Sequence, residues 1–164
     1  MIFEFKNLLF VTKNGIVKRT SVSEFENINR NGKIAISLKE DDELAFVKLT
    51  TGNDEIIIAG SNGKAVRFNE DQIRVMGRSA AGVTGFNCDG SEVVGVALSN
   101  EGKTILSISE NGYGKRSYLE DYRLTSRGKK GVRTINITEK TGKLVSVKAV
   151  NGDEDVMIVS SSVS

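Results

Sequence analysis

The chain has 164 residues, of which 38% are hydrophobic and 27% are charged, with a formal net charge of +2, a composition typical of a folded domain rather than a disordered chain. No apolar run approaches the roughly 20 residues that span a bilayer, and the N-terminus lacks the features of a signal peptide, so we expect a cytoplasmic protein without membrane partners. The absence of histidine and the single cysteine exclude a Ser-His-Asp triad, an imidazole metal site, an internal disulfide and a four-cysteine zinc cluster.

Short runs rich in valine, isoleucine and leucine follow one another along the chain and predict strands. They lie at residues 8–12, 16–20, 34–38 and 44–49, then at 55–59, 65–68, 82–86 and 93–98, then at 104–109, 114–118, 131–137 and 144–150, with a last run at 156–160. The best helical stretches, residues 23–28 and 69–75, are long enough for only a turn or two. Because no helical stretch of crossover length separates the strands, a parallel sheet is excluded.

The strands belong to an internal repeat marked by an Asn-Gly pair at residues 14–15, 62–63 and 111–112, with spacings of 48 and 49 residues. Asparagine tolerates and glycine favours the positive φ angles of a type I′ hairpin turn, so we expect each repeat to open with such a turn. Four antiparallel strands per repeat predict an all-β fold of propeller-like blades. We expect residues 1–164 to form one unit, with repeats at 7–52, 53–102 and 103–152 and with 153–164 as the first strand of a further blade.

Charge is segregated within each repeat. The first halves, residues 12–34, 61–83 and 111–133, carry net charges of +3, +2 and +5, whereas residues 35–60, 84–110 and 134–164 carry −4, −3 and −1. Equivalent positions of successive blades lie on the same side of the assembly, so the basic halves should merge into one stripe. Such a stripe predicts binding of duplex DNA or RNA through its phosphates, with little sequence preference and strong salt dependence. Aromatic residues are too few to predict a single-strand platform.

The candidate phosphate contacts are basic residues near glycines, where small neighbours let a nucleic-acid backbone come close. The densest cluster has no acidic neighbour and consists of Arg127, Lys129, Lys130 and Arg133. The further candidates are Lys115, Arg116, Arg78, Arg30, Lys33, Arg67, Lys18 and Arg19. Two alternatives stay open. A solvated face also explains the pairs at 18–19 and 115–116, and the arginine that recurs fifteen residues after each Asn-Gly glycine (Arg30, Arg78 and Arg127) can instead bond loop carbonyls.

Several stretches resemble the C-terminal domain of the A subunit of bacterial DNA gyrase, with the corresponding domain of topoisomerase IV as the second match. They lie within residues 7–160, at 9–20 (LFVTKNGIVKRT), 28–36 (INRNGKIAI), 76–83 (MGRSAAGV), 110–116 (ENGYGKR) and 126–132 (SRGKKGV). The resemblance implies a β-pinwheel, a propeller-like ring whose blades exchange strands and whose basic rim binds, bends and wraps duplex DNA in support of ATP-dependent negative supercoiling. As partners in a heterotetramer it implies the rest of the gyrase A subunit, together with the gyrase B subunit.

The same resemblance implies that this chain is not an enzyme on its own, because the DNA-cleaving tyrosine, ATP and Mg belong to other domains. We therefore expect no catalytic residue, no metal site and no cofactor here. The family's box, Gln-Arg-Arg-Gly-Gly-Lys/Arg-Gly, is matched at residues 125–131 only at Arg127, Gly128, Lys130 and Gly131. With about three blades and one strand, a partial ring is expected, and its open edges are able to self-associate. A protein-interaction propeller is the alternative from another class, although the chain lacks the tryptophan of WD repeats.

Overall fold

The computed structural model describes residues 4–25 and 36–151. These residues form three antiparallel sheets and no α-helix, which confirms the predicted all-β class. The long strands are β1 (Asn7–Thr12), β2 (Ile16–Ser21), β3 (Leu44–Thr50), β4 (Glu55–Gly60), β5 (Lys64–Asn69), β7 (Val93–Leu98), β8 (Thr104–Ser109), β9 (Gly114–Tyr118) and β11 (Leu144–Val150). The short elements are β6 (Val83–Thr84), β10 (Val132–Arg133) and the 3-10 turns η1 (Val22–Phe25), η2 (Glu70–Gln72) and η3 (Leu119–Asp121).

Neighbouring sheets exchange a strand. The sheet orders are β3-β1-β2-β6, β10-β5-β4-β7 and β11-β8-β9, so β6 of the second repeat pairs with β2 of the first, and β10 of the third pairs with β5 of the second. The four runs of one repeat therefore do not form one sheet, because the third run joins the sheet of the preceding repeat. This is the strand exchange that the resemblance implied.

The exchange is supported by the glycines of the first two hairpin turns, Gly15 and Gly63. The carbonyl of Gly15 accepts hydrogen bonds from the backbone N–H groups of Gly85 and Phe86, at 2.8 and 3.1 Å. The carbonyl of Gly63 accepts the equivalent pair from Thr134 and Ile135, at 2.7 and 3.4 Å. These contacts end the exchanged strands early, so β6 and β10 have two residues each where longer runs were predicted. The predicted strand at 34–38 shows no strand in its described part, 36–38, and the run at 156–160 lies outside the described residues.

The hairpin turns differ from the expected type I′ turn. Gly15 has a φ of 91° and donates its N–H to the carbonyl of Thr12 at 3.1 Å, so the central residues of the turn are Lys13 and Asn14. Asn14 does not have a positive φ. The geometry is that of a three-residue loop in which an ordinary turn is followed by one left-handed residue, and only the glycine needs the left-handed conformation.

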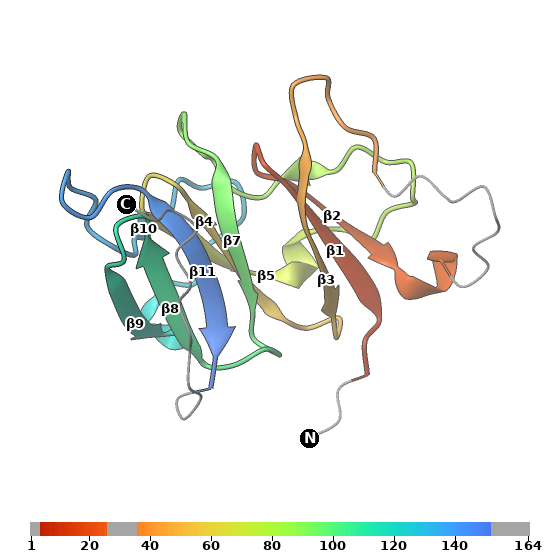
Figure 1. Cartoon of the computed structure of the whole chain (residues 1–164). Coiled ribbons are helices and arrows are strands. Elements are labelled where there is room, and N and C mark those ends of the chain that lie inside the picture. Colours follow the sequence, from red (N-terminus) through yellow and green to blue (C-terminus); the bar gives the residue numbers. More distant parts are fainter. Residues whose placement is uncertain (1–3, 26–35, 152–164) are drawn as a thin grey trace.

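The core lies between successive sheets, and β4 is buried on both faces. Ile56 and Ile58 belong to the cluster shared with the first sheet, whereas Ile57 and Ala59 belong to the cluster shared with the third. Figure 1 shows β3, β7 and β11 next to one another, in agreement with the contacts of β7 with both β3 and β11. These three strands form the inner edge of the three sheets. The exchanged strands β6 and β10 form the opposite, outer edge.

Candidate nucleic-acid interface

Two basic loops lie at the outer edge. Val75 pairs with Arg19 of β2, and β6 then pairs with β2 again further along, so residues 76–82 form a loop between the two pairings. In the third repeat, Leu124 pairs with Arg67 of β5, and β10 then pairs with β5 further along. Residues 125–131 form the equivalent loop between these two pairings. We call residues 76–82 the first rim loop and residues 125–131 the second rim loop. The corresponding part of the first repeat carries Arg30 and Lys33, which lie outside the described residues.

Lys18 holds the first rim loop from inside and does not reach solvent. Its Nζ donates to the carbonyls of Gly77, Arg78 and Ala80, at 3.0, 2.6 and 3.4 Å, and lies 5.5 Å from the centre of the Phe10 ring. Its relative exposure is 0%. Desolvation by burial lowers the pKa of Lys18, Arg78 lowers this pKa further, and Glu24 opposes both effects. The expectation that Lys18 contacts phosphate is therefore wrong.

The arginine that recurs four residues after the Asn-Gly glycine ties one blade to the next. Arg19 is 8% exposed, its Nε donates to the carbonyl of Ile73 at 2.6 Å, and its Nη1 lies 2.9 Å from Oε1 of the fully buried Glu70. Arg67 donates from Nη1 to the carbonyl of Tyr122 at 2.7 Å. Tyr122 occupies the same repeat position as Ile73, because each follows the Asn-Gly glycine of its own repeat by ten residues.

The Nε of Arg67 also donates to Oε2 of Glu55 at 2.9 Å. Arg19 and Arg67 therefore hold the blades together and are removed from the candidate DNA contacts. The third repeat carries Lys115 and Arg116 at the positions of Lys18 and Arg19, on the exposed strand β9. Unlike Lys18 and Arg19, both side chains are exposed, so phosphate contact by Lys115 and Arg116 stays a prediction.

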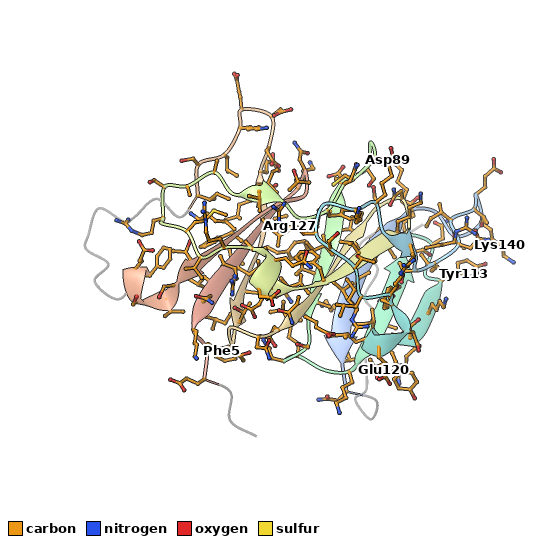
Figure 2. All side chains as sticks on the ribbon, turned by 180° about the vertical axis from the view of Figure 1, so that it is seen from behind. Phe5, Asp89, Tyr113, Glu120, Arg127 and Lys140 are labelled. Atoms are coloured by element: carbon orange, nitrogen blue, oxygen red, sulfur yellow. The ribbon has the colours of Figure 1, made fainter. Side chains whose placement is uncertain are left out.

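Arg127, labelled in Figure 2, anchors the second rim loop with its own side chain. Its Nε donates to the carbonyl of Gln72 at 3.1 Å and its Nη1 donates to the carbonyl of Thr84 at 3.0 Å. Its backbone N–H donates to Oε1 of Gln72 at 2.8 Å. For Arg127, therefore, the structure supports the alternative in which this arginine bonds loop carbonyls.

Four basic residues, half-buried Lys64 and exposed Lys129, Lys130 and Arg133, lie at the outer edge of the second sheet. Arg133 of β10 lies directly opposite Lys64 of β5, and neither has an ion-pair partner among residues 4–25 and 36–151. Like charges opposite each other on paired strands destabilise a sheet unless an anion lies between them. Lys129 and Lys130 precede β10, and both are exposed. Nζ of Lys130 lies 3.6 Å from Oδ1 of Asp89.

Lys64 was missed in the sequence analysis because its position opposite Arg133 depends on the strand exchange. Arg74 and Arg123 are exposed, and both follow the Asn-Gly glycine of their repeat by eleven residues. On the first rim loop, the side chain of Arg78 is half-buried and forms no ion pair within the part of the chain that the structure describes.

The acidic residues form a separate group at the first hairpin turn. A cavity of about 410 Å³ is lined by Asp42, Glu43 and Glu92 together with Lys13. Nζ of Lys13 lies 3.1 Å from Oε2 of Glu92 and 4.0 Å from Oε2 of Glu43, and the hydrogen bond and charge of Glu92, followed by the charge of Glu43, raise the pKa of Lys13. The described residues contain no cluster of three or more His, Cys, Asp or Glu arranged to hold a metal. The helical turns among them are all too short and too polar to cross a bilayer.

Comparison with known proteins agrees with this geometry. The family described as DNA gyrase C-terminal domain, beta-propeller, matches residues 6–51, 54–100 and 103–151, one segment for each repeat. The chain is 50% identical to the DNA gyrase A subunit of Ureaplasma parvum serovar 3 over 157 residues, which cover 95% of this chain and 19% of that protein. It is also 50% identical to the DNA gyrase A subunit of Staphylococcus epidermidis (strain ATCC 12228) over 158 residues, 94% of this chain and 18% of that protein.

Two solved structures share the fold. The structure of a DNA gyrase A C-terminal domain has a TM-score of 0.77 and 27% identity, covering 92% of this chain and 50% of the other. The C-terminal domain of a DNA topoisomerase IV also has a TM-score of 0.77, with 29% identity, covering 88% of this chain and 46% of the other. The chain thus spans about a fifth of its curated relatives and half of the solved domains. Its three repeats, its exchanged strands and these matches show that the chain belongs to the DNA gyrase C-terminal domain family.

Proposed function

We propose that this chain binds duplex DNA through its phosphates along the outer edge of the sheets, and bends and wraps it as part of the gyrase A subunit. The observation that carries the proposal is that half-buried Lys64 and exposed Arg133 lie directly opposite each other, and that neither cation has an ion-pair partner among the described residues. Phosphate is the anion that relieves this repulsion most naturally in a protein related to gyrase. The contact residues that we propose are Lys64, Arg78, Lys129, Lys130 and Arg133.

These contacts come from loops and strand ends of two neighbouring sheets, Arg78 beside the first and the other four beside the second. Bending a site of about 20 to 30 base pairs costs on the order of 1 to 6 kcal/mol, and phosphate contacts spread along the bend offset that cost. The described residues contain no helix able to enter the major groove, and backbone contacts carry no sequence information. We therefore expect binding without sequence preference.

The relatives support a role within a larger protein. As a C-terminal module of the gyrase A subunit, the chain would present wrapped DNA to the remainder of that polypeptide and to the gyrase B subunit. It would thereby support ATP-dependent negative supercoiling in the cytoplasm without catalysing a step itself. The relatives at 50% identity are gyrase proteins, which favours gyrase over topoisomerase IV.

The outer edge of β9 is open in the third sheet, where the described residues supply three strands instead of four. An unpaired edge presents backbone N–H and carbonyl groups to any available strand. Either a further blade or a second copy of the chain can pair there. We expect sedimentation of the isolated chain to show concentration-dependent association if a second copy does so.

Energy transfer between dyes at the two ends of a duplex of about 40 base pairs tests the bending. The chain should bring the ends closer, and a scrambled sequence of the same length should respond with the same affinity. Binding without approach of the ends would contradict wrapping. No binding even at low salt would contradict the DNA-binding function and favour a protein-interaction propeller.

A further inference from the structure

The first rim loop is held by an unusually complete set of hydrogen bonds. Its four consecutive carbonyls, from Gly77 to Ala80, all face the protein. Lys18 Nζ donates to those of residues 77, 78 and 80, whereas Ser37 donates from Oγ to residue 79 at 2.6 Å and from its backbone N–H to residue 80 at 3.3 Å. A buried ammonium is costly unless it is hydrogen-bonded, so this amine and this loop conformation depend on each other.

The two rim loops differ in how they are anchored. In the second rim loop the side chain of Arg127 itself bonds the carbonyls of Gln72 and Thr84. The position equivalent to Lys18 is there occupied by Val66, which lies in the hydrophobic core. In the first rim loop the buried Lys18 supplies the anchor, so the guanidinium of Arg78 is not needed for it.

We propose that Lys18 is a positioning residue for phosphate contact by Arg78. It never touches DNA, and it acts by ordering the backbone that carries Arg78 while leaving that side chain available. This inference rests on the proposed function, because it assumes that Arg78 contacts phosphate. DNA affinity then depends on Lys18, although this lysine is fully buried and a map of surface charge would not include it.

A double-mutant cycle on the 164-residue chain tests the proposal. The affinity for a duplex of about 40 base pairs is measured from about 0.05 to 0.2 M salt for Arg78→Gln, Lys18→Met and the double variant. Arg78→Gln should weaken binding about three- to tenfold at the lower salt and reduce the salt slope by about 0.9. Lys18→Met should weaken binding by a similar factor, and the double variant should bind no more weakly than Arg78→Gln alone.

The control is Lys48→Met, which removes the same charge from β3 at the inner edge, where Lys48 lies 2.7 Å from Oε2 of Glu101. It should leave the affinity unchanged. If urea unfolding shows that Lys18→Met does not fold, Ser37→Ala takes its place in the cycle. Ser37→Ala removes one exposed hydrogen bond of the same loop, from Oγ of Ser37 to the carbonyl of Ser79. An effect of Ser37→Ala only when Arg78 is present supports the proposal.

Two results with the Lys18 and Ser37 variants overturn the proposal. One is a folded Lys18→Met or Ser37→Ala variant that binds DNA as tightly as the unmodified chain. The other is a loss of DNA affinity in either variant that adds fully to the loss caused by Arg78→Gln. Failure of the proposed function is distinct, because the unmodified chain would then bind no duplex at all. If it binds and Arg78→Gln has no effect, the function stands and this inference is wrong.

Discussion

Replacing Glu70 should destabilise the junction between the first two blades. The carboxylate of Glu70 is fully buried and accepts from Nη1 of Arg19 at 2.9 Å, from Oγ1 of Thr50 at 2.9 Å and from the backbone N–H of Asp54 at 2.6 Å. Glu70→Leu introduces the residue that the third repeat has at the equivalent position, Leu119. It leaves a buried guanidinium without its carboxylate and two donors without their acceptor.

Breaking a buried ion pair by removing one partner costs about 3 to 5 kcal/mol, a large part of the roughly 5 to 15 kcal/mol that stabilises a typical domain. With a urea dependence of about 2 kcal/mol per M, a loss of about 4 kcal/mol lowers the unfolding midpoint by about 2 M. Urea titration followed by circular dichroism measures this shift.

The matched variant combines Glu70→Leu with Arg19→Met and removes both charges. It should be more stable than the sum of the single effects predicts, by about 2 kcal/mol or more, because no charge is left buried without a partner. A loss below about 1 kcal/mol for Glu70→Leu, or full additivity in the double variant, would refute the view that this pair ties the two blades together.

Two further predictions concern the second rim loop and the single cysteine. Gly131→Ala should destabilise the chain by about 3 kcal/mol or more in urea unfolding, because Gly131 has a φ of +79° and an added Cβ would lie 2.2 Å from the carbonyl oxygen of Ala65. Gly128 has a φ of +83°, but a Cβ added there would meet no atom nearer than 3.7 Å, so Gly128→Ala should lower the free energy of unfolding by only about 1 kcal/mol. Equal losses of stability in the two alanine variants would show that the close contact at Gly131 has no effect. Burial raises the pKa of the Cys88 thiol from 9.0 to about 11, so alkylation at about pH 8 should be about a hundredfold slower in the folded chain than in urea and should accelerate about tenfold per pH unit. Equal rates in the two states would show that the thiol is not protected.

The positions of the long strands could be predicted because their signals are local. The runs at 16–20, 55–59, 93–98 and 104–109 agree with β2, β4, β7 and β8 to within one residue. The exchanged strands could not be predicted from periodicity, since their partners belong to another repeat. Likewise, the Asn-Gly pair correctly indicated a hairpin but not its turn type, because only the glycine adopts the left-handed conformation.

The candidate site could be predicted in its region but not in its residues. Recurrence marked the arginines four and fifteen residues after the Asn-Gly glycine as important, yet it could not show that Arg19 and Arg67 bond the next blade. The burial of Lys18 depends on carbonyls about 60 residues further along the chain, and a Lys-Arg pair in sequence carries no sign of that contact. Lys64 became a candidate only when its strand partner was known.

The dependence of duplex affinity on salt concentration decides whether the outer edge binds phosphates. A triple variant with Lys64→Gln, Lys129→Gln and Arg133→Gln is compared with a control that carries the same loss of charge at Lys6, Lys48 and Lys148, away from that edge. The outer-edge variant should reduce the slope of log affinity against log salt by about 2.7, or 0.9 for each lost contact, while the control keeps the slope of the unmodified chain. Equal slopes for the two triple variants would mean that the protein attracts DNA only through its overall charge, and would contradict a defined binding edge.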